Sequence, residues 1–162
     1  MILEKELSFS RLLLESAREN FETMIFMGVQ EVDQPDQSIE GDVLMGTITF
    51  KEALEGSFSI ACSNNCARAI ALNMLGMDPS EELSHEEVCD AIGEVTNLIM
   101  GSIKKNLRGH INDLTLSVPW VTSGKTLDNN LGEGSQKVSV FLNIEDEHLA
   151  ELTLSYRNNV NG

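Results

Sequence analysis

The chain has 162 residues, the size of one ordinary domain with room for a substantial core. Hydrophobic residues make up 41% of the sequence and charged residues 23%, which is typical of a globular protein and not of a disordered one. Asp and Glu number 26 against 11 Lys and Arg, so the formal net charge is −15. Such an acidic chain is a poor ligand for nucleic acid or for an anionic membrane surface. A protein with a basic active-site rim is a better partner.

The N-terminal stretch MILEKELSFSRLLLES has neither a basic n-region nor a small-residue cleavage site, so it does not resemble a signal peptide. No window approaches the roughly 18 consecutive apolar residues of a membrane span. The three cysteines, Cys62, Cys66 and Cys89, are not accompanied by a second Cys or His pair that would complete a metal site. We therefore expect free thiols in a cytoplasmic protein that holds no metal of its own.

The N-terminal part of the chain predicts a long helix over 7–27, ended by Gly28, followed by a loop. The loop over 29–41 is rich in turn-forming residues, and a short edge strand is expected at its start. The apolar side of the helix consists of Leu14, Ala17, Phe21, Met24 and Ile25.

A hairpin and a second helix come next. Strands are predicted over 42–50 and 53–62, with the residues KEALEG supplying the turn between them. The helix that follows is expected to be capped by Asn64 or Asn65 and to stop at Gly76.

A further long amphipathic helix is predicted over 84–107. Ser84 and Glu87 have the spacing of a capping box, and Gly109 is suited to the left-handed residue that terminates a helix. At about 100° per residue, one apolar stripe faces the core. The stripe consists of Val88, Ile92, Val95, Ile99 and Ile103.

The C-terminal part predicts a strand over 114–121, in which Pro119 marks an edge or a bulge because proline lacks a backbone donor. A polar loop is expected over 122–134, and strands over 138–144 and 152–156 alternate cleanly as a second hairpin.

Together these elements predict one domain over 1–162, with residues 157–162 as a frayed tail. Strands joined by short turns and helices that are apolar on one side predict the α+β class, with a largely antiparallel sheet and long amphipathic helices packed on it as layers. A strand exposed at the sheet edge, near Pro119 or in the final hairpin, makes a homodimer plausible.

The exposed side of the 84–107 helix carries Asp90, Glu94, Asn97 and Gly101 at intervals of four, three and four residues. A carboxamide cannot act as a base or a nucleophile, but it donates one hydrogen bond and accepts another, which is what positioning a water molecule requires. A carboxylate at position 94 is suited to pairing with a lysine of a partner. Gly101 fits two interpretations, close approach of a partner's backbone or close packing within the chain.

No P-loop, nucleophile elbow or paired metal motif is present. The segment DAIGEVTNLIMGSIKKNL, followed downstream by SVPWVTSG, instead resembles the signature of the CheC, CheX and FliY family of chemotaxis phosphatases, CheX most closely. In these proteins an Asp or Ser, a Glu and an Asn on a helix precede a proline, here Asp90, Glu94, Asn97 and Pro119. The resemblance is weaker around GSFSIA, and it covers most of residues 42–125.

This resemblance implies a hydrolase that removes the phosphoryl group from the phosphoaspartate of a CheY-type response regulator. Asn97 would orient the attacking water and Glu94 would form a salt bridge with the regulator's active-site lysine. Asp90, Gly101 and Lys104 would contact the partner, which would itself hold the Mg²⁺. CheC-like members carry a second Glu-x-x-Asn on the first helix, which residues 7–27 lack, so a single-site CheX-like protein is expected.

Two alternatives remain open from the sequence. The first is a non-enzymatic adaptor of the same fold that binds a receiver domain or a flagellar-switch component. The second is purely structural, with Glu94 and Asn97 forming part of a solvated helix face. Intact Glu94 and Asn97 favour the phosphatase, because an adaptor does not need a carboxamide that positions water.

Overall fold

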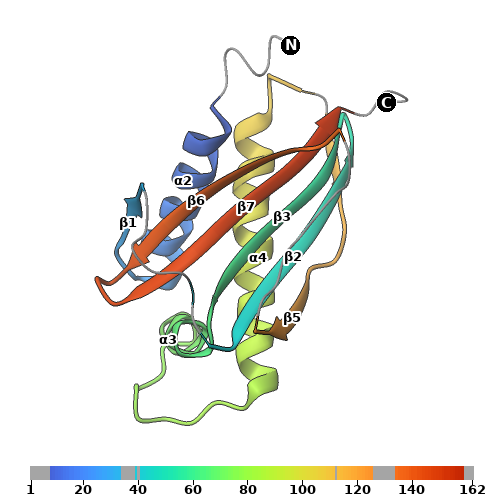
Figure 1. Ribbon diagram of the computed structural model, residues 1–162. Coiled ribbons are helices and arrows are strands. Elements are labelled where there is room, and N and C mark those ends of the chain that lie inside the picture. Colours follow the sequence, from blue (N-terminus) through green and yellow to red (C-terminus); the bar gives the residue numbers. More distant parts are fainter. Residues whose placement is uncertain (1–7, 34–38, 40, 112, 126–133, 159–162) are drawn as a thin grey trace.

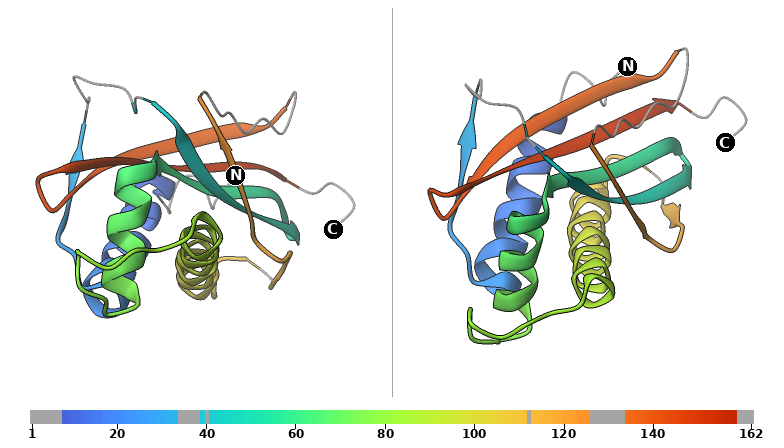
Figure 2. Two further views of the ribbon diagram at one scale, coloured as in Figure 1. Left: turned by 90° about the horizontal axis from the view of Figure 1, so that it is seen from below. Right: turned by 60° about the horizontal axis from the view of Figure 1, so that its bottom comes forward.

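The computed structural model describes residues 8–33, 39, 41–111, 113–125 and 134–158. These residues form a seven-stranded antiparallel sheet with helices along one of its faces (Figures 1 and 2). The predicted α+β class with a largely antiparallel sheet is therefore confirmed. None of the described helices is long and apolar enough to cross a membrane.

The sheet has the strand order β1-β6-β7-β3-β2-β4, and β5 also pairs with β2. The predicted short edge strand and both hairpins are present. The strands are β1 (Val29–Val32), β2 (Val43–Glu52), β3 (Leu54–Ser63), β4 (Leu114–Leu116), β5 (Trp120–Gly124), β6 (Gln136–Ile144) and β7 (His148–Asn158).

Several strands are longer than the sequence predicted, because pairing with a neighbouring strand continues through polar residues. The hairpin turns within KEALEG as predicted, because the last β2–β3 pair joins Phe50 to Gly56. Strand structure nevertheless extends to Glu52 and resumes at Leu54, since these residues pair with β4 and β7. The expected loop over 122–134 is wrong at its start, where residues 122–124 pair with β2. Residues 126–133 lie outside the described part of the chain. The predicted frayed tail is wrong at Arg157, which belongs to β7 and forms an ion pair with Glu55 at 2.7 Å.

The helices are α2 (Phe9–Asn20), its continuation η1 (Phe21–Ile25), α3 (Asn64–Met74) and α4 (His85–Leu107). Figure 2 shows α2, α3 and α4 side by side on the same face of the sheet. The cap of α3 was predicted wrongly, because the hydroxyl of Ser63, and not Asn64 or Asn65, accepts the Cys66 N–H at 3.1 Å.

The end of the first helix differs from the prediction. Its last turn, η1, is a π turn, and Phe26, not Gly28, adopts the left-handed conformation that ends it, with φ 62°. Because a π turn contains more residues than an α turn, it shifts the side chains that follow around the helix. Met24, which was predicted on the apolar side, is 47% exposed as a result. Ala17, Phe21 and Ile25 are buried as predicted.

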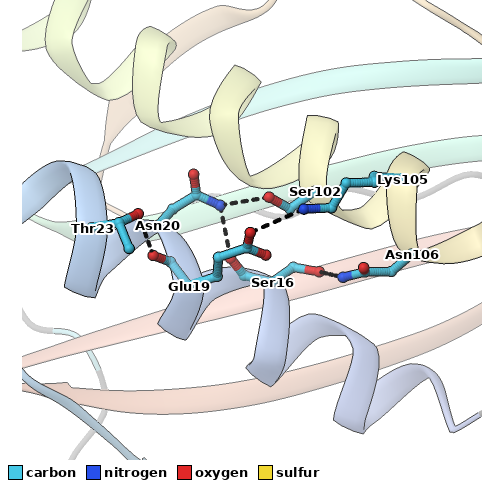
Figure 3. Close-up of polar contacts among 7 residues, drawn as sticks. All are labelled: Ser16, Glu19, Asn20, Thr23, Ser102, Lys105 and Asn106. Carbon is cyan, nitrogen blue, oxygen red and sulfur yellow. Dashed lines mark hydrogen bonds and ion pairs between the residues drawn. The ribbon is translucent and has the colours of Figure 1, made fainter.

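A polar seam joins α2 to α4 (Figure 3). The Asn20 side chain at its centre is buried, and its Nδ2 donates both to the Ser16 carbonyl at 2.8 Å and to Ser102 Oγ at 2.9 Å. Two contacts flank it, from Asn106 Nδ2 to Ser16 Oγ at 3.2 Å and from Lys105 Nζ to Glu19 Oε1 at 3.0 Å. Because hydrogen bonds between two helices are directional, they fix the relative positions of the helices, and the seam keeps α4 from sliding along its axis relative to α2.

Candidate functional site

Helix α4 begins at a capping box and ends beside a glycine, as the sequence predicted. Ser84 Oγ accepts the Glu87 N–H at 3.1 Å, and Glu87 Oε1 accepts the Ser84 N–H at 3.1 Å. Arg108 leaves the helical conformation and Gly109 follows with φ 90°. The first turn of the helix is therefore fixed by reciprocal bonds, which sets the orientation of the faces that follow.

The predicted apolar stripe of α4 is buried in full, with Val95, Ile99 and Ile103 completely inaccessible to solvent. The helix can lie close to the sheet because Gly46 of β2 has no side chain beneath Thr96. One face of α4 is thus held against β2, and the opposite face points outward.

The outward face presents four residues in a row, Asp90, Glu94, Asn97 and Gly101, which we call the α4 ridge. All four are exposed. Among the described residues, no side chain forms an ion pair with the two carboxylates or a hydrogen bond with the Asn97 carboxamide. The polar groups of the ridge are therefore available to a partner molecule.

A groove runs between the α4 ridge and β5, and we call it the α4–β5 groove. It contains the part of the ridge that carries Glu94 and Asn97, together with Pro119 from a segment that is distant in sequence. Its lining residues are Cys89, Asp90, Gly93, Glu94, Asn97, Pro119, Trp120 and Val121. The structure thus brings Pro119 next to the two residues with which the sequence motif associates it.

Pro119 lies in a bulge, which confirms the prediction for this position. Pairing with β2 stops at Leu116 and resumes at Trp120, and between them two residues of β2 face the three residues 117–119. Ser117 holds the bulge in place, because its N–H donates to the Thr49 carbonyl and its hydroxyl accepts the Thr49 N–H, both at 2.9 Å.

The bulge also corrects the predicted strand over 114–121, whose alternation placed Leu116, Val118 and Trp120 on one face. The additional residue reverses the alternation, so Val121 packs against the core while Val118 and Trp120 are exposed. The contribution of Trp120 to the groove was therefore not predicted from the sequence. In the sequence, only Pro119 indicated that the alternation of this strand is interrupted.

The two glycines of α4 have different surroundings. A Cβ on Gly93 would lie 3.8 Å from Val121 Cγ2, an ordinary contact distance. Beyond its own helix turn, a Cβ on Gly101 would have no atom of the described residues within 4 Å. Close packing within the described chain therefore does not require glycine at position 101.

Lys104 was predicted to contact a partner, and in the structure it has an intramolecular one. Its Nζ lies 3.4 Å from Asp113 Oδ1, and its side chain is 26% exposed. The pKa of Asp113 is lowered, chiefly by the hydrogen bond from the Leu114 N–H and further by the charge of Lys104. Lys104 thus links α4 to the segment before β4, and its contact with a partner stays a prediction.

The pKa values of Cys62 and Cys89 are raised above the ordinary value of a thiol. Burial raises the pKa of Cys89, and the neighbouring Asp90 charge raises it further, which favours the thiol over the thiolate. The hydrogen bond with Cys66 and burial raise the pKa of Cys62 well above its ordinary value. Among the residues that the structure describes, no group of three or more His, Cys, Asp or Glu side chains is arranged to hold a metal ion. The α4 ridge itself offers hydrogen bonding and charge pairing.

An antiparallel sheet covered on one face by helices is the fold of the CheX and CheC chemotaxis proteins. CheX from Vibrio vulnificus superposes with a TM-score of 0.76 at 28% identity, covering 93% of this chain and 97% of that one. A CheC-like superfamily protein from Shewanella sp. PV-4 gives 0.73 at 26% identity, with coverage of 93% and 97%. CheX in a CheX–CheY–BeF₃–Mg²⁺ complex from Borrelia burgdorferi gives 0.69 at 18% identity, with coverage of 94% and 100%.

A match to a family model identifies the family of this chain within that class of chemotaxis proteins. The family model described as chemotaxis phosphatase CheX matches residues 44–143, a range that contains the α4 ridge, Pro119 and most of the sheet. The chain belongs to the CheX family. A comparison with curated proteins gave no significant match.

Proposed function

We propose that this chain hydrolyses the phosphoaspartate of a CheY-type receiver domain, with the α4 ridge as the catalytic surface. The proposal rests on the presence of Glu94 and Asn97 on the same helix face in a chain of the CheX family. Both residues are exposed, and neither has a side-chain partner among the described residues. Charge complementarity supports it, since the ridge is acidic and a receiver's phosphorylation site carries cations.

Asn97 has the role of positioning the water molecule. Hydrolysis requires a water oxygen to attack phosphorus while the bond from phosphorus to the aspartyl oxygen breaks, giving inorganic phosphate and a free aspartate. The Asn97 carboxamide accepts a hydrogen bond from the water and directs its oxygen at phosphorus, but it takes no proton. Orientation alone is a large effect in phosphoryl transfer, because there is little covalent chemistry for the protein to perform.

Glu94 has the role of holding the two proteins in register. Its carboxylate lies one turn from Asn97 on the same face, so a salt bridge to the receiver's phosphate-site lysine would bring the carboxamide to the phosphoryl group. The Mg²⁺ is assigned to the receiver. The solved B. burgdorferi assembly contains CheX, CheY, BeF₃ and Mg²⁺.

The test is the decay of a phosphorylated CheY-type receiver in Mg²⁺, with this chain added in catalytic amounts. The native chain is expected to accelerate decay. Asn97→Ala should lose most of the acceleration, about 10²-fold, as expected for loss of a positioning group. Glu94→Ala should weaken it mainly through a higher KM. Asn65→Ala and Glu22→Ala remove exposed residues of the same types from α3 and η1, and they serve as matched controls.

The outcomes separate the proposal from its alternatives. Unchanged decay with measurable receiver binding would identify a non-enzymatic adaptor. Equal losses in the control variants would show that the effects are not specific to the ridge.

A further inference from the structure

The α4–β5 groove has two chemically different walls. One wall carries the carboxylates of Asp90 and Glu94, and the opposite wall is the segment from Pro119 to Val121. We propose that this groove receives an apolar, cation-bearing segment of the receiver beside its phosphorylation site, and that Trp120 with Val118 determines which receivers are accepted. The inference rests on the proposed function and adds the basis of its specificity.

Two apolar side chains on this side of the groove are exposed to solvent. Trp120, which lines the groove, is 45% exposed, and Val118, which adjoins the groove on the other side of Pro119 without lining it, is 83% exposed. Neither belongs to the hydrophobic core, whereas Val121, the next residue along β5, packs against it. An exposed tryptophan beside polar groups is the type of residue that most often dominates the binding energy of a protein interface.

The acidic wall indicates the charge of the occupant. Asp90 and Glu94 are like charges one helical turn apart, an arrangement that is unfavourable unless cations approach it. No Lys or Arg lines the groove, and the ion pairs among the described residues leave both carboxylates unused. A partner with a positive group near an apolar side chain satisfies both walls.

The usual size of a protein interface indicates that a bound receiver covers more of this chain than the α4 ridge alone. Specific interfaces bury about 800 Å² on each partner, more than three short side chains and a glycine on one helix provide. The groove is continuous with the ridge through Asp90, Glu94 and Asn97, so a receiver positioned over Asn97 would cover the Pro119 bulge as well.

The chain contains a single tryptophan, which makes the groove directly observable. The protein would be labelled with 5-fluorotryptophan and titrated with an unlabelled receiver carrying BeF₃⁻ and Mg²⁺, a non-hydrolysable mimic of the phosphorylated state. We expect the ¹⁹F resonance of Trp120 to shift and to become shielded from a soluble quencher. The same titration with Asn65→Ala should give the same shift, because Asn65 is an exposed residue of α3 outside the groove.

Kinetics give the second measurement. Trp120→Ala and Val118→Ala should each raise KM for the phosphorylated receiver by about tenfold or more, with kcat unchanged, because the lost contacts act on docking. Val118 is so exposed that its truncation cannot disturb folding. Phe141→Ala is the matched control, since Phe141 is a partly exposed aromatic residue of β6 that points away from the helices, between the buried Val140 and Leu142.

The results can overturn the inference without affecting the proposed function. Accelerated decay with an unmoved ¹⁹F resonance and unchanged KM would leave the phosphatase intact and exclude the groove. A resonance that shifts with protein concentration alone would assign the patch to self-association. A receiver-dependent shift without accelerated decay would support docking in the groove while rejecting catalysis.

Discussion

Gly46 of β2 lies directly beneath Thr96 of α4, and nothing larger than glycine fits there. A Cβ on Gly46 would overlap the Thr96 hydroxyl and lie 3.2 Å from Ile92 Cγ2. The Thr96 side chain is fully buried, and its hydroxyl donates to the Ile92 carbonyl at 2.7 Å. Since Asn97 is the next residue, this contact sets how far the α4 ridge stands above the sheet.

Gly46→Val is expected to destabilise the fold by about 1–3 kcal/mol, the usual cost of overpacking, and to displace α4. Urea denaturation would measure the stability, and receiver dephosphorylation would report the displaced ridge. Combining Gly46→Val with Thr96→Ala should restore part of the loss, because the overlapping hydroxyl is removed. Unchanged stability in Gly46→Val would contradict the close approach.

Gly101→Ala tests why a glycine occupies the middle of α4. Beyond its own helix turn, a methyl group at this position would meet no atom of the described residues within 4 Å, and alanine is preferred to glycine in helices by about 1 kcal/mol. We therefore expect a more stable protein that binds the receiver more weakly, because the partner's backbone is kept away. Calorimetric titration with BeF₃⁻-loaded receiver would detect this. Unchanged affinity would show that the partner does not approach Gly101.

The polar seam between α2 and α4 should be energetically coupled. Asn20→Ala leaves the partly buried Ser102 hydroxyl without its donor, and we expect a loss of about 0.5–1.5 kcal/mol. A double-mutant cycle with Ser102→Ala should give a coupling energy of about 0.5–3 kcal/mol, measured by thermal or urea unfolding. Strict additivity of the two variants would mean that the hydrogen bond drawn in Figure 3 contributes nothing.

The reactivity of Cys89 should depend on pH in a defined direction. The thiolate is the reactive form. Because burial and the charge of Asp90 raise its pKa, alkylation by iodoacetamide should still be rising at pH 9. Asp90→Asn removes the repelling charge, lowers the pKa and should speed alkylation at any fixed pH below it. Mass spectrometry would follow the modification, with the buried Cys62 and Cys66 as internal controls. A plateau below pH 8 would contradict the assigned direction.

The sequence was sufficient for the local features of the site. The spacing of Val88, Ile92, Val95 and the rest of the stripe established which side of α4 is buried, and by difference which side carries Glu94 and Asn97. The capping box and the bulge or edge at Pro119 could also be predicted from the sequence. The first depends on residues that are close in the chain, and the second on the chemistry of one residue type.

The errors occurred where the tertiary structure overrides local preference. Residues with turn-forming or polar character, such as Lys51, Glu52 and residues 122–124, became strand because a partner strand supplies hydrogen bonds that local propensity does not count. Likewise the π turn at η1 moved Met24 out of the apolar face, which a regular helical period cannot anticipate.

The sequence alone determined that α4 presents a carboxylate and a carboxamide on one exposed face, since a helical repeat follows from spacing. Only the tertiary structure decided what lies beside them. The bulge at residues 117–119 brings Pro119 and Trp120 to Asn97, and its position depends on a strand pairing with β2 that joins distant parts of the chain. Local periodicity carries no information about such a pairing, because it is stabilised by contacts that exist only in the folded protein.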